Sequence, residues 1–365
     1  MYPDPILRQM SGNSIPMYNK LLENDLRYIL NHTESLWRDC KGKTIFITGG
    51  TGFFGKWFLE TISFLNYEMN LDLMTIVLSR EPDKFIREYP YFKQTMIRFV
   101  QGDVRDYTFP KEDVHFIIHA GNTVSDKLNN EKPLEMFETI VEGTRHVLHM
   151  AKEKRVESFL FTSSGAVYGN QLQDMTRIPE TYLGTHDCLD VRSAYSEGKR
   201  AGEMLCSLYH HQFQIPVKIA RCFAFVGPYL PLDKHFAIGN FILNAIKGED
   251  IVIQGDGTPS RSYLYINDLM IWLWTLMLRG KTNEPYNVGS TEEITTEALA
   301  NCVAHAVNPA LKIIIRQNKI KNIPPQRYVP NVDKIVHELG VNQKVFLDDA
   351  LQRTVSFNRK TLGLI

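Results

Sequence analysis

One short stretch constrains the fold more than any other part of the chain. Thr44–Gly55 reads Thr-Ile-Phe-Ile-Thr-Gly-Gly-Thr-Gly-Phe-Phe-Gly, and Lys56–Phe64 follows with the apolar spacing of a helix. A buried strand, a glycine-rich turn and a helix in this order bring the backbone close to a pyrophosphate and aim the helix N-terminus at it. The stretch therefore predicts a dinucleotide site, while a tight turn of purely structural purpose remains open. The residues expected to contact the dinucleotide here are Gly49, Thr51, Gly52, Phe53, Phe54 and Gly55.

Strand candidates and helix candidates alternate after this turn. The helical stretches include Pro133–Ala151 and Ala194–His210. Alternation of this kind predicts βαβ units with right-handed crossovers, and hence the α/β class. We expect a Rossmann-type, doubly wound parallel sheet with the dinucleotide beyond the carboxyl ends of its strands. The expected strands are Thr44–Thr48, Met74–Ser79, Ile97–Val100, Phe116–His119, Ser158–Thr162 and Val217–Arg221.

The composition excludes several other classes of protein. The chain has 41 Lys and Arg against 41 Asp and Glu with no run of like charge, so we expect neither a nucleic-acid partner nor a membrane partner. Its five cysteines lack the spacing of a metal site, which predicts free thiols in a reducing compartment and no bound metal. The apolar segment Met270–Leu278 is too short to span a bilayer and predicts a buried helix. Because no secretion signal begins the sequence, we expect a cytoplasmic protein.

The end of the second expected strand bears on which dinucleotide is bound. It reads Ser79-Arg80-Glu81 where an acid would hold the ribose 2′-hydroxyl of NAD. Arg80 can instead pair with the 2′-phosphate of NADP, and Ser79 can hydrogen-bond it. A small shift in register would place Glu81 there. The sequence thus favours NADP(H) and leaves NAD open.

Two further strand ends are expected to contact the cofactor. After the third strand, Asp103 with its neighbour Val104 could accept a hydrogen bond from the adenine amino group, or Asp103 could be an ordinary turn aspartate. At the end of the fourth strand, the small residues Ala120 and Gly121 would let the backbone approach the dinucleotide. His119 precedes them at the same edge, and we expect its imidazole to be a structural group more than an acid or base.

The chemistry is expected from three side chains. Tyr195 and Lys199 occur as Tyr-Ser-Glu-Gly-Lys near the start of a helix, and Ser164 follows the fifth strand. Positions i and i+4 share a helix face, so the ammonium of Lys199 can lower the pKa of the Tyr195 phenol. That phenol could exchange a proton with a sugar or alcohol oxygen held by Ser164, while a nicotinamide exchanges hydride.

Together these motifs resemble the extended short-chain dehydrogenase/reductases that act on nucleotide sugars, the NAD-dependent epimerase/dehydratase family. The resemblance rests on TGGTGFFG at 48–55, SSGAVYG at 163–169 and YSEGK at 195–199. It implies that Ser164 holds the substrate oxygen and that Tyr195 is the acid–base. It also implies that Lys199 binds the nicotinamide ribose, so that Tyr195 and Lys199 count among the cofactor contacts as well.

The same resemblance implies a nucleotide-diphosphate sugar as substrate and a homodimer built on the helices near 134–151 and 195–210. Arg261 and Arg327 would face the diphosphate, because the planar guanidinium matches phosphate oxygens, and Asn240 would be a polar partner. Arg327 could equally be a surface residue, and Asn240 could cap a helix over 241–246. We expect an N-terminal extension at 1–43, a dinucleotide-binding domain at 44–225 and a mainly substrate-binding region at 226–365 that returns strands to the sheet.

Members of the resembled family share hydride removal at the sugar C4 and differ in the later steps of their reactions. In 4,6-dehydratases an Asp-Glu pair stands where this chain has Gly165 and Ala166, and UDP-glucuronate decarboxylases carry a glutamate at the position of Ala166. Elimination and decarboxylation therefore lack an acidic group. Ile140 and Ala224 replace asparagines that the family usually carries.

A site reduced to serine, tyrosine and lysine suits two reactions, 4-keto reduction with exchangeable NADPH and 4-epimerisation with retained NAD. Because Ser79 and Arg80 favour NADPH, we expect reduction of the C4 keto group of a dTDP- or CDP-linked 4-keto-6-deoxy sugar, as in the synthesis of surface-polysaccharide sugars. The alternative is a 4-epimerase with tightly bound NAD, ahead of a decarboxylase or dehydratase. A non-catalytic dinucleotide sensor is an alternative of another class.

Overall fold

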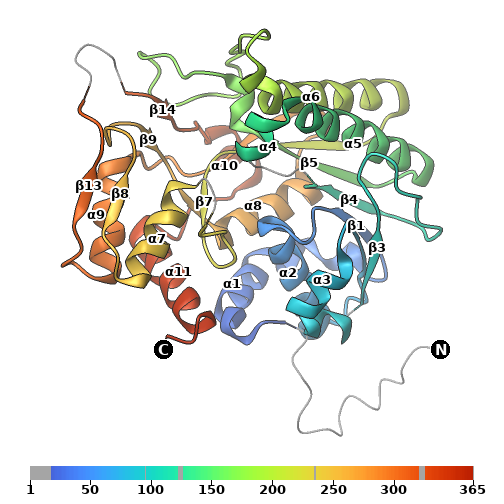
Figure 1. Ribbon diagram of the computed structural model, residues 1–365. Coiled ribbons are helices and arrows are strands. Elements are labelled where there is room, and N and C mark those ends of the chain that lie inside the picture. Colours follow the sequence, from blue (N-terminus) through green and yellow to red (C-terminus); the bar gives the residue numbers. More distant parts are fainter. Residues whose placement is uncertain (1–17, 95, 122–125, 234–235, 320–324, 365) are drawn as a thin grey trace, which may run out of the picture.

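The computed structural model describes residues 18–94, 96–121, 126–233, 236–319 and 325–364 (Figure 1). At its centre lies a seven-stranded sheet made of β1 (Thr44–Thr48), β2 (Met74–Ser79), β3 (Ile97–Gln101), β4 (Phe116–His119), β5 (Ser158–Ser164), β6 (Val217–Cys222) and β11 (Pro285–Val288). Their order is β11-β6-β5-β4-β1-β2-β3, and neighbouring strands are parallel. The predicted α/β class with a doubly wound parallel sheet is confirmed.

The position of β1 creates the crevice expected for a dinucleotide. Its last residue, Thr48, pairs with Leu78 of β2 on one side and with His119 of β4 on the other. From β1 the chain builds the sheet in one direction through β2 and β3, and in the other through β4, β5 and β6. At such a reversal the connecting loops diverge, which leaves room for a ligand at the carboxyl ends of the strands.

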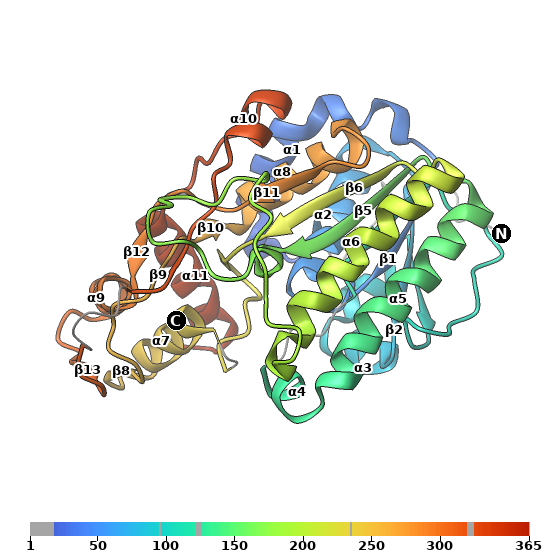
Figure 2. The same ribbon diagram turned by 90° about the horizontal axis from the view of Figure 1, so that it is seen from above.

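Helices cover both faces of this sheet (Figure 2). On one face, α5 (Pro133–Lys154) and α6 (Ala194–Phe213) pack side by side against β4 and β5. On the other face lie α2 (Phe53–Met69) and α8 (Ile266–Arg279), with α1 (Glu23–Thr33) packed on both. Because α8 lies between the sheet and α1, its side chains are buried on almost every side, as its apolar sequence predicts.

The segment before β1 belongs to the core of the molecule. Leu26, Ile29 and Trp37 are fully buried, and the rings of Trp37 and Trp274 meet edge-on with centroids 4.9 Å apart. Residues 18–43 therefore pack against the helices of one face of the sheet. Residues 1–17 of the expected N-terminal extension lie outside the described residues.

The C-terminal part of the chain, from residue 225 onward, contributes both to the large sheet and to a smaller part of the structure. β11, α8 and α10 (Asp333–Leu339) belong to the large sheet and its covering layer, and most of the remainder forms a smaller part at one end of the molecule (Figure 1). That part contains three small sheets, formed by β7 with β10, by β9 with β12 and β14, and by β8 with β13. The bounds of these strands are β7 (Phe225–Val226), β8 (Ile251–Ile253), β9 (Ser260–Arg261), β10 (Leu264–Tyr265), β12 (Ile294–Thr295), β13 (Ile313–Ile315) and β14 (Arg327–Tyr328). The remaining helices are α3 (Pro82–Glu88), α4 (Asp126–Glu131), α7 (Ala237–Lys247), α9 (Thr296–Val307) and α11 (Leu347–Thr361).

Some elements extend further than predicted. α2 begins at Phe53 instead of Lys56, because Gly55 has no side chain and its Cα fits against the backbone of the turn. β5 continues to Ser164 and β6 to Cys222, and these two residues are partners in the sheet. The five cysteines are free thiols, as predicted. Within the described ranges, every helix is too short or too polar to cross a membrane.

Candidate active site

The glycine-rich turn lies directly against the end of β4. Gly49 has a φ of +72°, in the left-handed region, and a Cβ on it would overlap the carbonyl group of Ala120. The N–H of Gly121 donates to Thr48 Oγ1 at 2.9 Å, and a Cβ on Gly121 would lie 2.6 Å from that oxygen. The structure thus brings the turn at residues 49–55 against Ala120 and Gly121, with a closeness that only glycine allows at 49 and 121.

The helix that follows the turn begins without a side-chain cap. Its N-cap, Gly52, has no side chain to accept from the first N–H groups of α2. Phe54 packs edge-on against Phe225 with ring centroids 5.2 Å apart, and Phe53 lies against Phe54. A firmly packed helix N-terminus with uncapped N–H groups suits an anion, so the residues present fit the pyrophosphate of a dinucleotide.

His119 is held inside the protein by two threonines. Its Nδ1 lies 2.7 Å from Thr48 Oγ1 and its Nε2 lies 3.0 Å from Thr144 Oγ1. Burial lowers the pKa of His119 to about 3, and the charge of Lys199 acts in the same direction. The imidazole is therefore neutral and structural, in agreement with the interpretation of the sequence. Both ring nitrogens of His119 are hydrogen-bonded to the threonines, so only the backbone of His119 is left to contact a cofactor.

Two residues of opposite charge, Arg80 and Glu81, follow β2, and their side chains face different groups. Arg80 and Glu81 are both exposed, and the Glu81 carboxylate lies 3.8 Å from Lys84 Nζ on α3. Ser79 Oγ accepts a hydrogen bond from the Glu81 N–H at 3.2 Å. The positive charge of Arg80 reaches Asp103 at the end of the neighbouring strand, where it helps to lower the pKa of that carboxyl. The Glu81 carboxylate thus faces Lys84 of the following helix α3. The charge of Arg80 instead acts on Asp103, at the edge of the sheet where the adenosine ribose is expected.

Arg105, two residues further along the chain, donates hydrogen bonds to the Asp103 carboxylate. Its Oδ1 accepts from the backbone N–H and from Nε of Arg105 at 3.0 and 2.8 Å, and its Oδ2 accepts from Arg105 Nη2 at 3.1 Å. Hydrogen bonds from Arg105 hold the pKa of Asp103 below its usual value. Val104 packs on α5, where a Cβ on Gly143 would lie 2.7 Å from Val104 Cγ1. The structure shows the turn aspartate, and the adenine contact stays a prediction.

Ser164, Tyr195 and Lys199 come together between β5 and α6. Ser164 ends β5, and Tyr195 and Lys199 lie in the first turns of α6, which packs on that strand. Lys199 Nζ donates to the carbonyl oxygen of Thr162 at 2.5 Å and lies 6.0 Å from the centroid of the Tyr195 ring. The Tyr195 N–H donates to Asn129 Oδ1 at 3.1 Å, which ties the start of α6 to α4. A strand end and a helix thus bring together the three side chains that the sequence selected.

The electrostatics of these groups differ from the expectation in one respect. Burial raises the pKa of Tyr195 to about 12. Burial also lowers the pKa of Lys199 to about 8. The pKa of the Tyr195 phenol is therefore raised, whereas the sequence led us to expect that Lys199 would lower it.

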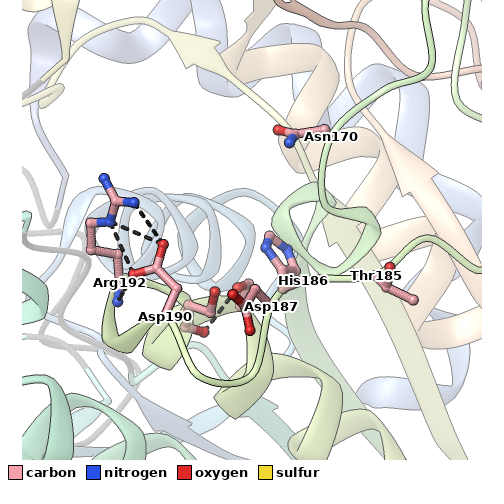
Figure 3. Close-up of a pocket in the computed structure, with 8 residues that line it drawn as sticks. Asn170, Thr185, His186, Asp187, Asp190 and Arg192 are labelled. Atoms are coloured by element: carbon pink, nitrogen blue, oxygen red, sulfur yellow. Dashed lines mark hydrogen bonds and ion pairs between the residues drawn. The ribbon is translucent and has the colours of Figure 1, made fainter.

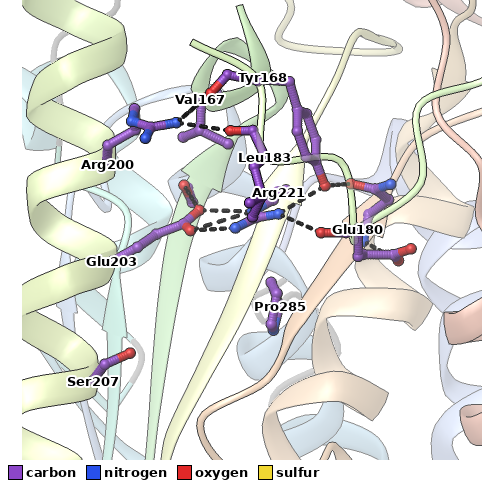
Figure 4. A network of polar contacts seen from close by, with 12 residues as sticks. Val167, Tyr168, Glu180, Leu183, Arg200, Glu203, Ser207, Arg221 and Pro285 are labelled. Atoms are coloured by element: carbon purple, nitrogen blue, oxygen red, sulfur yellow. Dashed lines mark hydrogen bonds and ion pairs between the residues drawn. The ribbon is translucent and has the colours of Figure 1, made fainter.

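A buried polar network lies behind the catalytic strand (Figure 4). Glu203 follows Lys199 by one helical turn and pairs with Arg221 of β6, Nη2 to Oε2, at 2.6 Å. Its Oε1 also accepts from Ser163 Oγ at 2.5 Å, and Arg221 donates to the hydroxyl of Tyr168 at 2.9 Å. These contacts fix β5, β6 and α6 relative to one another. The sequence analysis missed Glu203, although the i+4 spacing from the lysine indicates a shared helix face.

Two aromatic rings fill the space beside Ser164. A Cβ on Gly165 would lie 2.5 Å from the Tyr328 hydroxyl and 2.8 Å from the Phe223 ring. The centroids of these two rings are 4.6 Å apart. From the sequence, Tyr328 was grouped with the substrate-binding C-terminal region by resemblance, without a contact of its own in the site. Tyr328 lies in β14, a two-residue strand near the end of the chain, which is too short to show a periodic sequence pattern.

The three residues expected to bind the substrate have different surroundings. Arg261 is exposed, pairs with Tyr328 between β9 and β14, and has its guanidinium carbon 5.6 Å from the centroid of that ring. Arg327 Nε binds Glu293 Oε1 at 2.9 Å. Asn240 is exposed inside α7, which begins at Ala237, so the alternative that Asn240 caps this helix is wrong. Of the three, Arg261 lies against Tyr328, whose hydroxyl approaches Gly165, the neighbour of Ser164.

A polar pocket of about 390 Å³ lies beside the start of α6 (Figure 3). Its lining residues are Asn170, Thr185, His186, Asp187, Asp190, Arg192, Ser193 and Ser196. Asp190 and Arg192 form an ion pair of 2.7 Å, and His186 Nε2 lies 2.6 Å from the carbonyl oxygen of Ala166. The pocket thus adjoins the turn that carries Ser164. In the part of the chain that the structure describes, no group of His, Cys, Asp and Glu side chains is arranged to hold a metal ion.

Known proteins share both the sequence pattern and the fold. Residues 45–289 match the model of the NAD dependent epimerase/dehydratase family. UDP-glucuronic acid decarboxylase 3 of Arabidopsis thaliana is 33% identical over 312 residues, which cover 84% of this chain and 86% of that protein. UDP-glucose 4-epimerase of Thermotoga maritima superposes with a TM-score of 0.75 at 21% identity, over 87% of this chain and 99% of that one. dTDP-glucose 4,6-dehydratase of Streptomyces venezuelae, solved with NAD bound, superposes with a TM-score of 0.75 at 24% identity, over 88% of this chain and 98% of that one. As the resemblance of the motifs predicted, the chain belongs to the NAD dependent epimerase/dehydratase family.

Proposed function

We propose that this protein reduces the C4 keto group of a dTDP- or CDP-linked 4-keto-6-deoxy sugar with NADPH. A bound nicotinamide would supply the hydride. Ser164 holds the carbonyl oxygen, and Tyr195 gives it a proton as the alcohol forms. Lys199 binds the nicotinamide ribose, and the exposed Arg261 faces the nucleotide diphosphate.

The proposal rests on the neutral surroundings of Ser164. Gly165 and Ala166 follow it without an ionisable side chain, and the Tyr328 hydroxyl and the Phe223 ring occupy the place of a side chain at 165. Elimination and decarboxylation need a carboxylate or carboxylic acid close to the sugar C5 and C6. A carbonyl reduction needs one proton donor and one group that holds the oxygen, and Tyr195 and Ser164 meet that need.

The choice of NADPH is supported by the end of β2. The 2′-phosphate of NADP requires a cation, and Arg80 places one beside Ser79 at this edge. The competing acid, Glu81, lies 3.8 Å from Lys84 Nζ. A freely exchanging NADPH is also what a reductase consumes.

A 4-epimerase with retained NAD is the second candidate, since a solved dehydratase of the same fold holds NAD and the three catalytic side chains would serve that reaction equally. The relatives of highest identity named above are decarboxylases of UDP-glucuronic acid. Decarboxylation is the weaker alternative, because Ala166 stands at the position of their glutamate by the resemblance of the motifs.

The test is a panel of substrates given to the purified protein. We expect oxidation of NADPH, followed by its absorbance, with dTDP- or CDP-4-keto-6-deoxyglucose, and loss of that activity in Tyr195→Phe. UDP-glucose and UDP-glucuronic acid are incubated in parallel and followed by NMR. Epimerisation of UDP-glucose without added cofactor would make the protein an epimerase, and a pentose product from UDP-glucuronic acid would make it a decarboxylase. Either result without NADPH oxidation would overturn the proposal.

A further inference from the structure

The turn that follows β5 is covered by a segment from further along the chain. Residues 183–186 lie directly on the turn at residues 165–169, and Thr185 forms a β-bridge with Gly169. Gly169 and Gly184 both have a positive φ, and a Cβ on either would overlap a backbone carbonyl group of the other segment. The two segments therefore meet backbone to backbone, at a closeness that glycine alone allows.

One arginine of α6 holds these two segments together (Figure 4). Arg200 Nη1 donates to the carbonyl oxygen of Val167 at 3.0 Å and to those of Leu183 and Gly184 at 3.1 Å each. Its Nε lies 3.6 Å from Glu197 Oε2, one turn earlier in the helix. Carbonyl oxygens only accept hydrogen bonds, so the three that converge here need a donor. Arg200 supplies it, and hydrogen bonds from a charged donor are stronger than those between neutral groups.

The same turn also sets the direction of the Ser164 hydroxyl. The N–H of Ala166, the second residue after Ser164, donates to Ser164 Oγ at 3.1 Å. The carbonyl oxygen of Ala166 lies 2.6 Å from His186 Nε2, in the covering segment. A shift of the turn would therefore move the N–H group to which the Ser164 hydroxyl is bonded.

We propose that Arg200 is a positioning residue, which fixes the turn after Ser164 relative to the side chains of Tyr195 and Lys199. Arg200 directly follows Lys199 in α6, so its bonds to the turn join the helix that carries the phenol to the strand end that carries the serine. A substrate oxygen held by Ser164 and Tyr195 needs both hydroxyls in place, and a displacement of about 1 Å can slow a reaction about 100-fold. This kinetic consequence rests on the proposed function, whereas the placement of the turn does not.

The experiment is the variant Arg200→Met, which keeps an unbranched side chain and removes the guanidinium. We expect the kcat of NADPH oxidation to fall about 10- to 100-fold, while the KM for NADPH stays within about twofold, because the cofactor edge is untouched. Arg200→Lys keeps a charged donor and should recover a large part of the lost rate. The matched control is Arg27→Met, which removes a guanidinium paired with Glu23 and Glu68 on the other face of the sheet and should leave kcat unchanged.

Hydrogen exchange of the free protein reports the placement of the turn without a substrate. We expect the amides of residues 165–169 and 183–186 to exchange about tenfold faster in Arg200→Met than in the wild type, while those of β1 and β2 keep their rates. Unchanged exchange in the two segments, or equally faster exchange throughout the sheet, would overturn the proposal. Faster exchange of the turn with an unaltered kcat would overturn it as well. If the wild type oxidises no NADPH, the proposed function fails, and the exchange rates decide whether Arg200 fixes the turn.

Discussion

Gly165 shows how one residue limits the chemistry of the site. Because it has no Cβ, the Tyr328 hydroxyl and the Phe223 ring can approach to 2.5 and 2.8 Å from the place where a Cβ would stand. Two neutral groups thus occupy the position beside Ser164. The sequence alone shows that position 165 lacks an acid. Only the folded chain shows that the Tyr328 hydroxyl and the Phe223 ring occupy this position instead.

Changing Gly165 to alanine should disturb these rings. We expect Gly165→Ala to lower the free energy of unfolding by about 1–3 kcal/mol, the usual effect of overpacking, and to lower kcat because Tyr328 is displaced from Ser164. Urea unfolding and NADPH oxidation measure the two effects. Gly255→Ala is the control, since a Cβ there meets no atom within 4 Å. Equal behaviour of the two variants would contradict the importance of this contact.

The buried His119 should make stability depend on pH. Its pKa in the folded protein is lowered from 6.5 to about 3, so the unfolded chain binds a proton that the folded chain excludes. This contribution to stability is complete above pH 6.5 and is lost as the pH falls toward about 3. Within that window, the free energy of unfolding of the wild type should fall by about 1.4 kcal/mol per pH unit relative to His119→Gln. Parallel curves of urea unfolding against pH would refute this assignment.

At the scale of secondary-structure elements, contacts between residues far apart in the sequence set the boundaries of helices and strands, which a local sequence pattern does not determine. The boundaries of β5 and α2 moved by a few residues, because the pairing of Ser164 with Cys222 and the fit of Gly55 on the turn are tertiary effects. The alternating pattern predicted the order and type of the elements, since strand and helix periodicities are local properties. The short strand β14 has too few residues to show any period.

The helix α1 is fixed to the body of the protein through one carboxylate. Asp25 accepts hydrogen bonds from the Tyr265 hydroxyl at 2.8 Å, from Asn267 Nδ2 at 2.9 Å and from Arg353 Nη1 at 3.0 Å. Asp25→Ala leaves these donors without their acceptor, so we expect the free energy of unfolding to fall by about 2–4 kcal/mol in urea titrations. Glu23→Ala removes only an exposed ion pair of the same helix and should change it by less than about 0.5 kcal/mol. A small effect in both variants would show that α1 is held by its apolar face alone.

At the scale of the whole molecule, an apolar face is left on the outside of α6. Met204 and Leu208, one helical turn apart on the same face of this helix, are 61% and 46% exposed. The resemblance of the motifs implied a homodimer built on α5 and α6, and an exposed apolar stripe on this helix suits such an interface. We infer that two copies pack through these helices.

Placing charges on this face should separate the copies. We expect the wild type to sediment as a dimer and the double variant Met204→Asp, Leu208→Asp to sediment as a monomer, because two carboxylates would be buried unpaired in the interface. The control is Tyr67→Asp, a change at a 56% exposed residue of α2 on the other face of the sheet. A wild type that sediments as a monomer, or a double variant that stays dimeric, would contradict the inferred interface.

The sequence by itself indicated the α/β class and the alternating strands and helices between residues 44 and 221, and it selected the glycine-rich turn and the trio Ser164, Tyr195 and Lys199 for the proposed site. Each depends on residues close together in the chain, whose spacing reports the local backbone. Only the tertiary structure decided that two threonines hydrogen-bond both ring nitrogens of His119, that Glu203 binds Ser163 and Arg221, and that the Tyr328 hydroxyl lies beside Gly165. These contacts join segments that no local period relates, because side-chain chemistry depends on which distant groups the packing brings within hydrogen-bonding distance.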